Sequence, residues 1–297
     1  MVLSVIELSD ALAGAVERAE VSVVRVDGGR RRPSSGTVFT DDGVIVTALH
    51  GLEREEGIEV FDGTSRLAAS WVGAEPALDL AVLRAERAVG KVPEFASEAE
   101  LRRGQLALSV SRAGRTPRVA LGVISGLSGE WRAPRGAKVS RYVELGLPIE
   151  AGFSGGLAVD PRGHALGVGM AGILRATALV LTRQTLERVV GSLLEHGRVQ
   201  RAYLGVSSQP VRLPAALAEK TGQRVALLVA GVEPGGPAEQ AGIGLGDVLF
   251  EASGARLASI EDLFGVLEPE RIEQPLSLRI LRGGVEQSIT VTPQARP

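Results

Sequence analysis

The stretch Gly152-Phe153-Ser154-Gly155-Gly156 is the most informative part of this 297-residue sequence. A nucleophilic serine needs an exposed hydroxyl on a tight turn and free backbone N–H groups directed at the charge that develops on a substrate carbonyl oxygen. Glycines before and after Ser154 permit such a turn, because glycine adopts conformations that other residues avoid. The pattern alone also fits a glycine-rich β-turn that carries no chemistry.

Two earlier residues complete a set with catalytic chemistry. His50 follows the apolar run 45–49, and Asp79 precedes the apolar run 80–83. Taken singly, the histidine fits a structural role and the aspartate fits a strand start near the surface, although a carboxylate entering so apolar a strand is costly to bury unpaired. Taken together, the order His, Asp, Ser is that of chymotrypsin and differs from those of subtilisin and the α/β-hydrolases. The sequence therefore predicts a triad of His50, Asp79 and Ser154.

The surrounding pattern predicts a mostly β chain. Short apolar segments separated by Gly, Pro or charged clusters are typical of an antiparallel barrel or sandwich, and they lie at 21–26, 37–40, 44–47, 58–61, 67–73, 79–84, 105–110, 118–125, 141–146, 164–171 and 178–182. Helical spacing occurs at 7–19, with Ser9 or Asp10 as the expected N-cap, and at 184–195.

A polar break at 196–201 separates two domains, 1–198 and 199–297. The second domain mixes strands and helices, which predicts an α+β fold. Its expected strands are 202–207, 225–231, 246–252, 276–281 and 285–292, and its main expected helices are 213–220 and 259–267.

Composition excludes several other classes. The formal charge of −2 gives no basic excess for nucleic acid, and the cluster Gly28–Arg32 is interpreted as a solvated loop. There is no cysteine, and the three histidines are far apart, so neither a metal site nor a cofactor is expected. No apolar run is long enough to span a membrane and no signal peptide is evident. The sequence as it stands indicates a cytoplasmic protein, or a periplasmic or extracellular one if a leader has been removed.

The motifs resemble those of the HtrA (DegP-like) serine proteases. The resemblance rests on Ser35-Gly36-Thr37-Val38-Phe39, Thr47-Ala48-Leu49-His50, Asp79-Leu80-Ala81-Val82-Leu83, the Ser154 stretch, Arg201-Ala202-Tyr203-Leu204-Gly205-Val206, and 232–249, and it covers nearly the whole chain. It implies a chymotrypsin-like double β-barrel with the triad in the cleft, followed by one PDZ domain. His50 is then the general base, Asp79 fixes its tautomer, and Ser154 attacks the peptide carbonyl. The N–H groups of Gly152 and Ser154 would form the oxyanion hole.

The resemblance also implies a peptide site in the PDZ domain. Tyr203, Leu204, Gly205 and Val206 look like the loop that binds a peptide C-terminal carboxylate. Leu263 and Leu267 are four residues apart, so they share a helix face that either walls the groove or belongs to the core.

Two departures from the family pattern bear on function. Phe153 stands where the family usually has asparagine, so its side chain either packs under the loop or disturbs the oxyanion hole. The first aromatic residue is Phe39, so the N-terminal aromatic contacts of trimeric relatives are missing, although a homo-oligomer is still compatible with the sequence. The leading hypothesis is an endopeptidase of protein quality control that cleaves unfolded or exposed protein segments. The alternative is a non-proteolytic, chaperone-like peptide binder.

For cleavage specificity, the fold implies an S1 pocket based near Pro148 and walled by Val168, Gly169, Met170 and Ala171. No aspartate lies at its base, so small or medium apolar P1 residues are expected, because an unpaired buried ammonium is costly. Glu150 is the threat to this expectation, because its carboxylate would favour basic P1 residues if it turned into the pocket.

Overall fold

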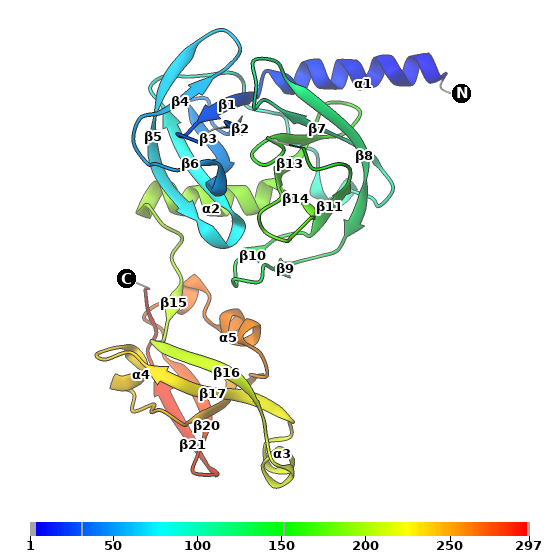
Figure 1. The fold of residues 1–297 in the computed structure, drawn as a ribbon. Coiled ribbons are helices and arrows are strands. Elements are labelled where there is room, and N and C mark those ends of the chain that lie inside the picture. Colours follow the sequence, from blue (N-terminus) through cyan, green and yellow to red (C-terminus); the bar gives the residue numbers. More distant parts are fainter. Residues whose placement is uncertain (1–3, 31, 151, 296–297) are drawn as a thin grey trace. The chain divides into compact units, whose positions relative to one another are not determined.

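The computed structural model describes residues 4–30, 32–150 and 152–295. The chain divides into two compact units, Met1–Val199 and Gln200–Pro297. The predicted fold class is confirmed, since the first unit consists of two closed β-barrels with two helices and the second unit is a mixed α+β domain (Figure 1).

The first barrel has the strand order β1-β2-β3-β6-β5-β4, antiparallel throughout. Its strands are β1 (Val23–Asp27), β2 (Ser34–Val38), β3 (Val44–Ala48), β4 (Ile58–Phe61), β5 (Arg66–Glu75) and β6 (Leu80–Ala85). Their inward side chains are mainly Val, Leu and Ile, which suit a pleated, buried surface. Closure pairs both edges of the sheet, so no strand of the barrel is left open.

The second barrel follows the order β11-β14-β13-β12-β7-β8. Its strands are β7 (Leu106–Ser111), β8 (Arg118–Leu127), β11 (Val143–Gly146), β12 (Leu157–Val159), β13 (Ala165–Met170) and β14 (Ala178–Leu181). A small hairpin of β9 (Trp131–Arg132) and β10 (Lys138–Val139) branches off before β11. The turn that carries Ser154 lies between β11 and β12.

Two helices pack on the barrels. α1 (Val5–Glu20) contacts β7 and β12, and α2 (Arg183–His196) contacts β5. The predicted cap of α1 at Ser9 or Asp10 is wrong: the N-cap is Ser4, where Ser4 and Glu7 form a reciprocal capping box. Gly197 ends α2 in a left-handed conformation.

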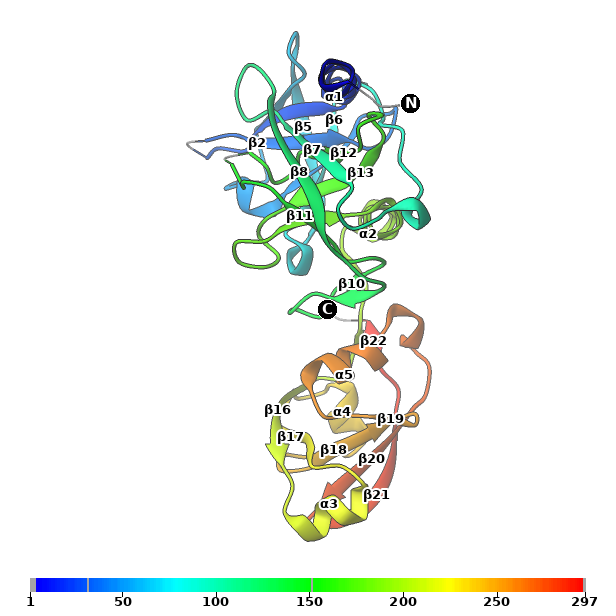
Figure 2. The same cartoon turned by 90° about the vertical axis from the view of Figure 1, so that its right-hand side faces the viewer.

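The second unit has a sheet in the order β16-β17-β18-β20-β21, with β19 paired to β18 (Figure 2). Its strands are β15 (Ala202–Tyr203), β16 (Val206–Arg212), β17 (Val225–Val232), β18 (Val248–Ala252), β19 (Ala255–Arg256), β20 (Leu276–Arg282), β21 (Val285–Val291) and β22 (Gln294–Ala295). Its helices are α3 (Ala215–Thr221), α4 (Pro237–Gln240) and α5 (Ile260–Val266). Within the part of the chain that the structure describes, β16 pairs with β17 alone, so its other edge is open to a further strand.

None of the described helices combines the length with the apolar character that crossing a lipid bilayer requires.

Candidate active site

His50 lies where the first barrel ends one of its buried strands. All five residues of β3 are buried, and the chain then enters a single 3-10 turn, Leu49–Gly51, that contains the histidine. The backbone N–H of Leu49 donates to the carbonyl of Asp79 at 2.8 Å, which fixes this turn against the start of β6. The imidazole side chain is about half exposed, so solvent can reach the ring although its backbone is fixed by this turn.

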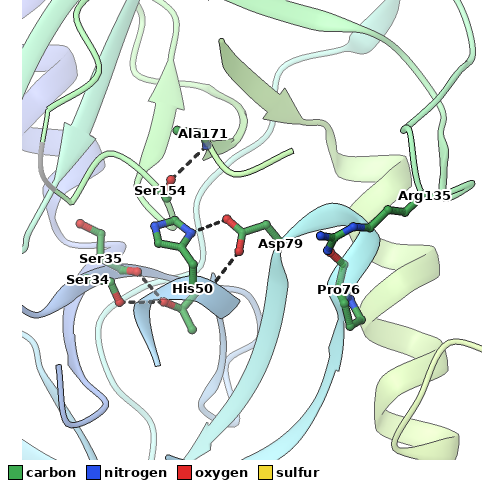
Figure 3. A network of polar contacts seen from close by, with 9 residues as sticks. Ser34, Ser35, His50, Pro76, Asp79, Arg135, Ser154 and Ala171 are labelled. Carbon is green, nitrogen blue, oxygen red and sulfur yellow. Dashed lines mark hydrogen bonds and ion pairs between the residues drawn. The ribbon is translucent and has the colours of Figure 1, made fainter. Parts of the chain in front are cut away.

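Asp79 is oriented toward His50 by an unusual backbone conformation. It has φ +54°, a left-handed value that aspartate tolerates better than most residues, and it caps the 3-10 turn Pro76–Leu78. Arg135 donates to the carbonyl of Pro76 at 3.3 Å and braces that turn. One carboxylate oxygen of Asp79 accepts from the His50 backbone N–H at 2.9 Å, and the other lies 2.5 Å from His50 Nδ1 (Figure 3). The carboxylate thus fixes both the position and the ring orientation of the histidine.

This contact changes the titration of the imidazole. The hydrogen bond to Asp79, followed by the charge of that carboxylate, raises the pKa of His50 above its ordinary value of 6.5. Partial burial and the positive charge of Arg30 act in the opposite direction but do not cancel the rise. The imidazolium is therefore stabilised, as a base that must accept a proton requires.

Ser154 lies next to the His50 imidazole, and its hydroxyl is directed toward Ala171, as Figure 3 shows. It is 6% exposed, and its Oγ accepts a hydrogen bond from the backbone N–H of Ala171 at 3.0 Å. The structure therefore brings together His50, Asp79 and Ser154, which are far apart in sequence.

The turn around Ser154 depends on glycine at two positions. Gly152 has φ +87° and Gly155 has φ +84°. A Cβ on Gly152 would lie 2.4 Å from the Cβ of Ala113, and one on Gly155 would lie 2.0 Å from the carbonyl oxygen of Ser35. Among the described residues, the N–H groups of Gly152 and Ser154 donate to no protein acceptor, so both are available to an oxyanion.

Phe153 packs under the loop and does not cover the cleft. It is 3% exposed and belongs to the core of the second barrel with residues such as Ile124, Leu145 and Val180. Its ring lies against Gly169, where an added Cβ would approach to 2.8 Å. The Phe153 N–H donates to the carbonyl of Glu150 at 3.1 Å, which closes the turn before the serine.

A cavity adjoins the serine, but its lining differs from the expected S1 wall. Val168 and Met170 are fully buried in a core cluster with Leu181 and Leu186 of β14 and α2. Successive side chains of a strand point to opposite faces, so Gly169 faces Phe153 and its two neighbours face away. Val168, Gly169 and Met170 therefore do not line this cavity, which corrects that part of the expected wall, whereas Ala171, the fourth expected wall residue, does line it.

The cavity beside Ala171 measures about 660 Å³. It is lined by Glu144, Leu145, Gly146, Leu147, Ile149, Ala171, Ala176 and Ala178. Pro148 is exposed and lies in the loop between two lining residues, Leu147 and Ile149. Ala171 connects this cavity to the serine, because its N–H contacts the Ser154 hydroxyl.

Two acidic residues near the cavity have defined partners. The Glu150 carboxylate lies 3.5 Å from the Arg118 guanidinium, with both side chains more than half exposed. Glu144, which sequence reasoning missed, lines the cavity and accepts a hydrogen bond from the Tyr142 hydroxyl at 2.7 Å. Burial and this carboxylate raise the pKa of Tyr142 to about 12.

The expected PDZ residues divide between loop and core. Gly205 has φ +78°, and the N–H groups of Leu204 and Gly205 donate to no acceptor among the described residues. The carbonyls of the same two residues accept from Ala238 and Glu233, both at 2.8 Å, which shapes the loop between Tyr203 and Val206. The side chains of Leu204 and Leu263 are buried in the domain core, whereas Leu267 and Val206 are partly exposed beside it.

Several residues near the serine had no role assigned from the sequence. Ser35 and Thr37 of β2 donate to the carbonyls of Gly152 and Gly155 at 2.6 and 2.9 Å. Gly172 leaves room for Asp79, because an added Cβ would lie 2.1 Å from its Oδ2. Ser35 and Thr37 belong to the stretch 35–39 that resembles the HtrA family, but nothing in the sequence indicated which groups they would contact.

Among the described residues, no group of three His, Cys, Asp or Glu side chains is placed to hold a metal ion.

Comparison with known families assigns both units. Residues 34–168 match the family described as trypsin-like peptidase domain, and residues 202–292 match the PDZ domain family. Among curated proteins, the putative serine protease HhoB of Synechocystis is 29% identical, over 89% of this chain and 66% of its own length. A probable periplasmic serine endoprotease, DegP-like, of Marinomonas is 27% identical, over 91% of this chain and 58% of its own. The chain thus spans about three fifths of the length of these relatives.

Solved structures with the same fold include HtrA-type proteases. The HtrA-type protease AlgW with a tripeptide superposes with a TM-score of 0.75 at 26% identity, covering 96% of this chain and 97% of that one. The serine endoprotease from Yersinia pestis gives a TM-score of 0.75 at 23% identity, covering 96% and 98%.

Proposed function

Since the chain belongs to the HtrA (DegP-like) family, with a trypsin-like peptidase domain and one PDZ domain, we propose that it is a serine endopeptidase that cleaves unfolded or exposed segments of other proteins. The observation that carries the proposal is the contact of Asp79 with His50 Nδ1, together with Ser154 next to the same imidazole. These residues hold a base, its orienting carboxylate and a nucleophile in the order that acyl transfer requires.

In the proposed reaction, Ser154 Oγ attacks the substrate carbonyl carbon while His50 Nε2 accepts the hydroxyl proton. The Asp79 carboxylate holds the proton on Nδ1, so that Nε2 is free to act as the base, and it stabilises the imidazolium that forms. The negative charge on the carbonyl oxygen is received by the N–H groups of Gly152 and Ser154. His50 then donates its proton to the leaving amine, and water hydrolyses the acyl-enzyme by the same steps.

The cavity beside Ala171 is proposed as the S1 pocket. Apart from Glu144, it is lined by Leu, Ile, Ala and Gly residues, which favours Val, Ala, Leu or Ile at P1. Glu150 does not favour basic P1 residues in this arrangement, because its carboxylate pairs with Arg118 at the surface. Glu144 takes its place as the acidic group to consider, although the Tyr142 hydroxyl already occupies one of its oxygens.

The PDZ domain is proposed to bind peptide C-termini. The free N–H groups of Leu204 and Gly205 would receive the carboxylate, and the open edge of β16 would pair with the peptide. Structures of the HtrA-type protease AlgW with a decapeptide and a tripeptide support peptide binding in this family.

A periplasmic location is proposed because relatives of this chain are named as periplasmic proteases. Cell fractionation tests this location against the cytoplasmic one.

The chaperone-like alternative was based on Phe153. Its ring is buried beneath the loop, so that reason no longer holds. Labelling with a fluorophosphonate tests the proposal directly: the wild-type protein should be labelled and should digest unfolded casein. Ser154→Ala should do neither while keeping its fold, and a wild-type protein that does not react would contradict the assignment.

A further inference from the structure

We propose that Ser35 is a positioning residue that holds the oxyanion-hole turn in place through the carbonyl of Gly152. The inference rests on the proposed peptidase function and adds to it a residue from outside the triad. Ser35 lies on β2 in the first barrel and is completely buried, whereas the turn belongs to the second barrel. The contact is therefore made across the interface between the barrels.

The Ser35 hydroxyl is fixed by two hydrogen bonds of opposite sense. It donates to the carbonyl oxygen of Gly152 at 2.6 Å and accepts from the backbone N–H of Arg112 at 2.8 Å. Because the Arg112 N–H occupies a lone pair of the hydroxyl, the hydroxyl proton is left to point at Gly152. A serine with a single partner could rotate away, but this one is held from both sides.

The residue that holds Ser35 is itself immobilised. Arg112 is 7% exposed, and its guanidinium donates to the carbonyls of Val23 at 2.8 Å and Glu20 at 3.3 Å. These carbonyls belong to the end of α1 and the start of β1. The hydroxyl is thus connected through Arg112 to the end of α1 and to β1 of the first barrel.

The backbone of Ser35 meets the other end of the same turn. Its carbonyl oxygen accepts from the Thr47 hydroxyl at 2.7 Å and lies where a side chain on Gly155 would be. Figure 3 shows Ser34 and Ser35 side by side to the left of His50. One residue therefore touches the turn both before and after Ser154.

This anchoring bears on catalysis through Gly152. The carbonyl and the N–H of Gly152 are attached to the same Cα, in a left-handed conformation that glycine leaves readily. Tying the carbonyl to Ser35 restricts rotation of that residue and so keeps its N–H directed at the oxyanion. Loss of a whole oxyanion donor costs about 10²- to 10³-fold in kcat, so we expect loss of its anchor to cost about 10- to 100-fold.

The test compares Ser35→Ala with the matched control Ser34→Ala. Ser34 is the preceding residue on β2, also buried, but its hydroxyl contacts Thr47 at 3.3 Å rather than the turn. Both full-length variants are assayed for kcat and KM on a peptide substrate and for inhibition by a peptidyl boronic acid, whose tetrahedral adduct places an oxygen in the oxyanion hole.

We expect Ser35→Ala to lower kcat and boronate affinity by the same factor, with KM changed less than about 3-fold, whereas Ser34→Ala leaves all three near wild type. The pH at which activity rises should not move, because Asp79 and His50 are untouched. A loss of kcat with unchanged boronate affinity, or an equal loss in Ser34→Ala, would overturn the inference. If Ser35→Ala does not fold, Ser35→Cys keeps the volume with a much weaker donor and should show the same paired loss. A wild-type protein that cleaves nothing and does not bind the boronate would instead refute the peptidase function.

Discussion

Replacing Asp79 by asparagine removes the charge behind His50 and leaves the shape of the site. Asparagine tolerates the left-handed conformation that residue 79 adopts at φ +54°, so the turn should persist. The amide oxygen can still accept from the His50 backbone N–H, but the amide NH₂ then faces Nδ1. A donor at that position favours the tautomer with its proton on Nε2, which cannot accept a proton from Ser154.

The expected loss is large because the wrong tautomer is inactive as a base. In an equivalent triad this change lowers kcat by about 10⁴-fold, which corresponds to roughly 5 kcal/mol in activation free energy. KM should change little, because Asp79 is beneath the imidazole and 10% exposed, out of contact with substrate. The loss should therefore appear almost entirely in kcat.

The pH dependence gives a second readout. In the wild type the pKa of His50 is raised by Asp79, so activity should rise with pH in a range above 6.5. Without the carboxylate the partial burial and Arg30 lower that pKa, and the remaining activity should rise at lower pH than in the wild type. The same linkage affects stability: the part contributed by protonated His50 is fully present below pH 6.5 and is lost as pH rises through the folded-state pKa. Asp79→Asn should lack this part.

The assay is a pH series of kcat/KM on a peptide substrate for wild type and Asp79→Asn. Asp160→Asn is a matched control, because Asp160 also lies beside a histidine, 3.5 Å from His164 Nδ1, but outside the site. The control should keep the wild-type profile. The reasoning would be refuted if Asp79→Asn kept activity within 10-fold of wild type or showed its rise in activity at higher pH.

Three further predictions concern other parts of the chain. Phe153→Ala should lower the free energy of unfolding by about 3–5 kcal/mol in chemical denaturation, because it empties a packed core site, and a change below 1 kcal/mol would contradict that packing. Mass-spectrometric mapping of cuts in an unfolded protein should show Val, Ala, Leu or Ile at P1; predominant cutting after Lys or Arg would indicate that Glu144 reaches the substrate. A peptide with an apolar C-terminal residue should bind Ser154→Ala by calorimetry and lose binding when its C-terminus is amidated, and equal affinity of both forms would exclude carboxylate recognition at Gly205.

Much of the fold could be predicted from local patterns in the sequence. Strands, turns and the domain boundary each have a signal within a few neighbouring residues. These signals are the alternation of apolar residues, the glycines at turns and the polar break before residue 202. The start of α1 was misplaced although its signal, Ser4 with Glu7 three residues on, is also local. The candidate triad could be proposed because each member carries rare chemistry at the end or start of a strand.

The S1 wall could be predicted only in part, because it depends on which face each residue of β13 presents. Motif spacing placed Val168, Met170 and Ala171 near the serine, but the side chains of Val168 and Met170 are buried in a core cluster that includes Leu186 of α2, and only Ala171 lines the cavity. A shift of one residue along a strand reverses its face, and the sequence contains no marker for the register of β13 within the barrel.

The contacts that hold the site together were invisible in the sequence for a different reason. They join residues of one barrel to residues of the other: Ser35 to Gly152, Thr37 to Gly155, and Gly172 to Asp79. Each pair combines a small hydroxyl or a glycine with a backbone or carboxylate group, and none has a distinctive composition. What selects these residues is the close approach of two separately folded barrels, where a single added Cβ would lie within 2.1 Å of the Asp79 carboxylate. The triad residues therefore supply the chemistry, whereas the small residues around them set the distances at which it operates.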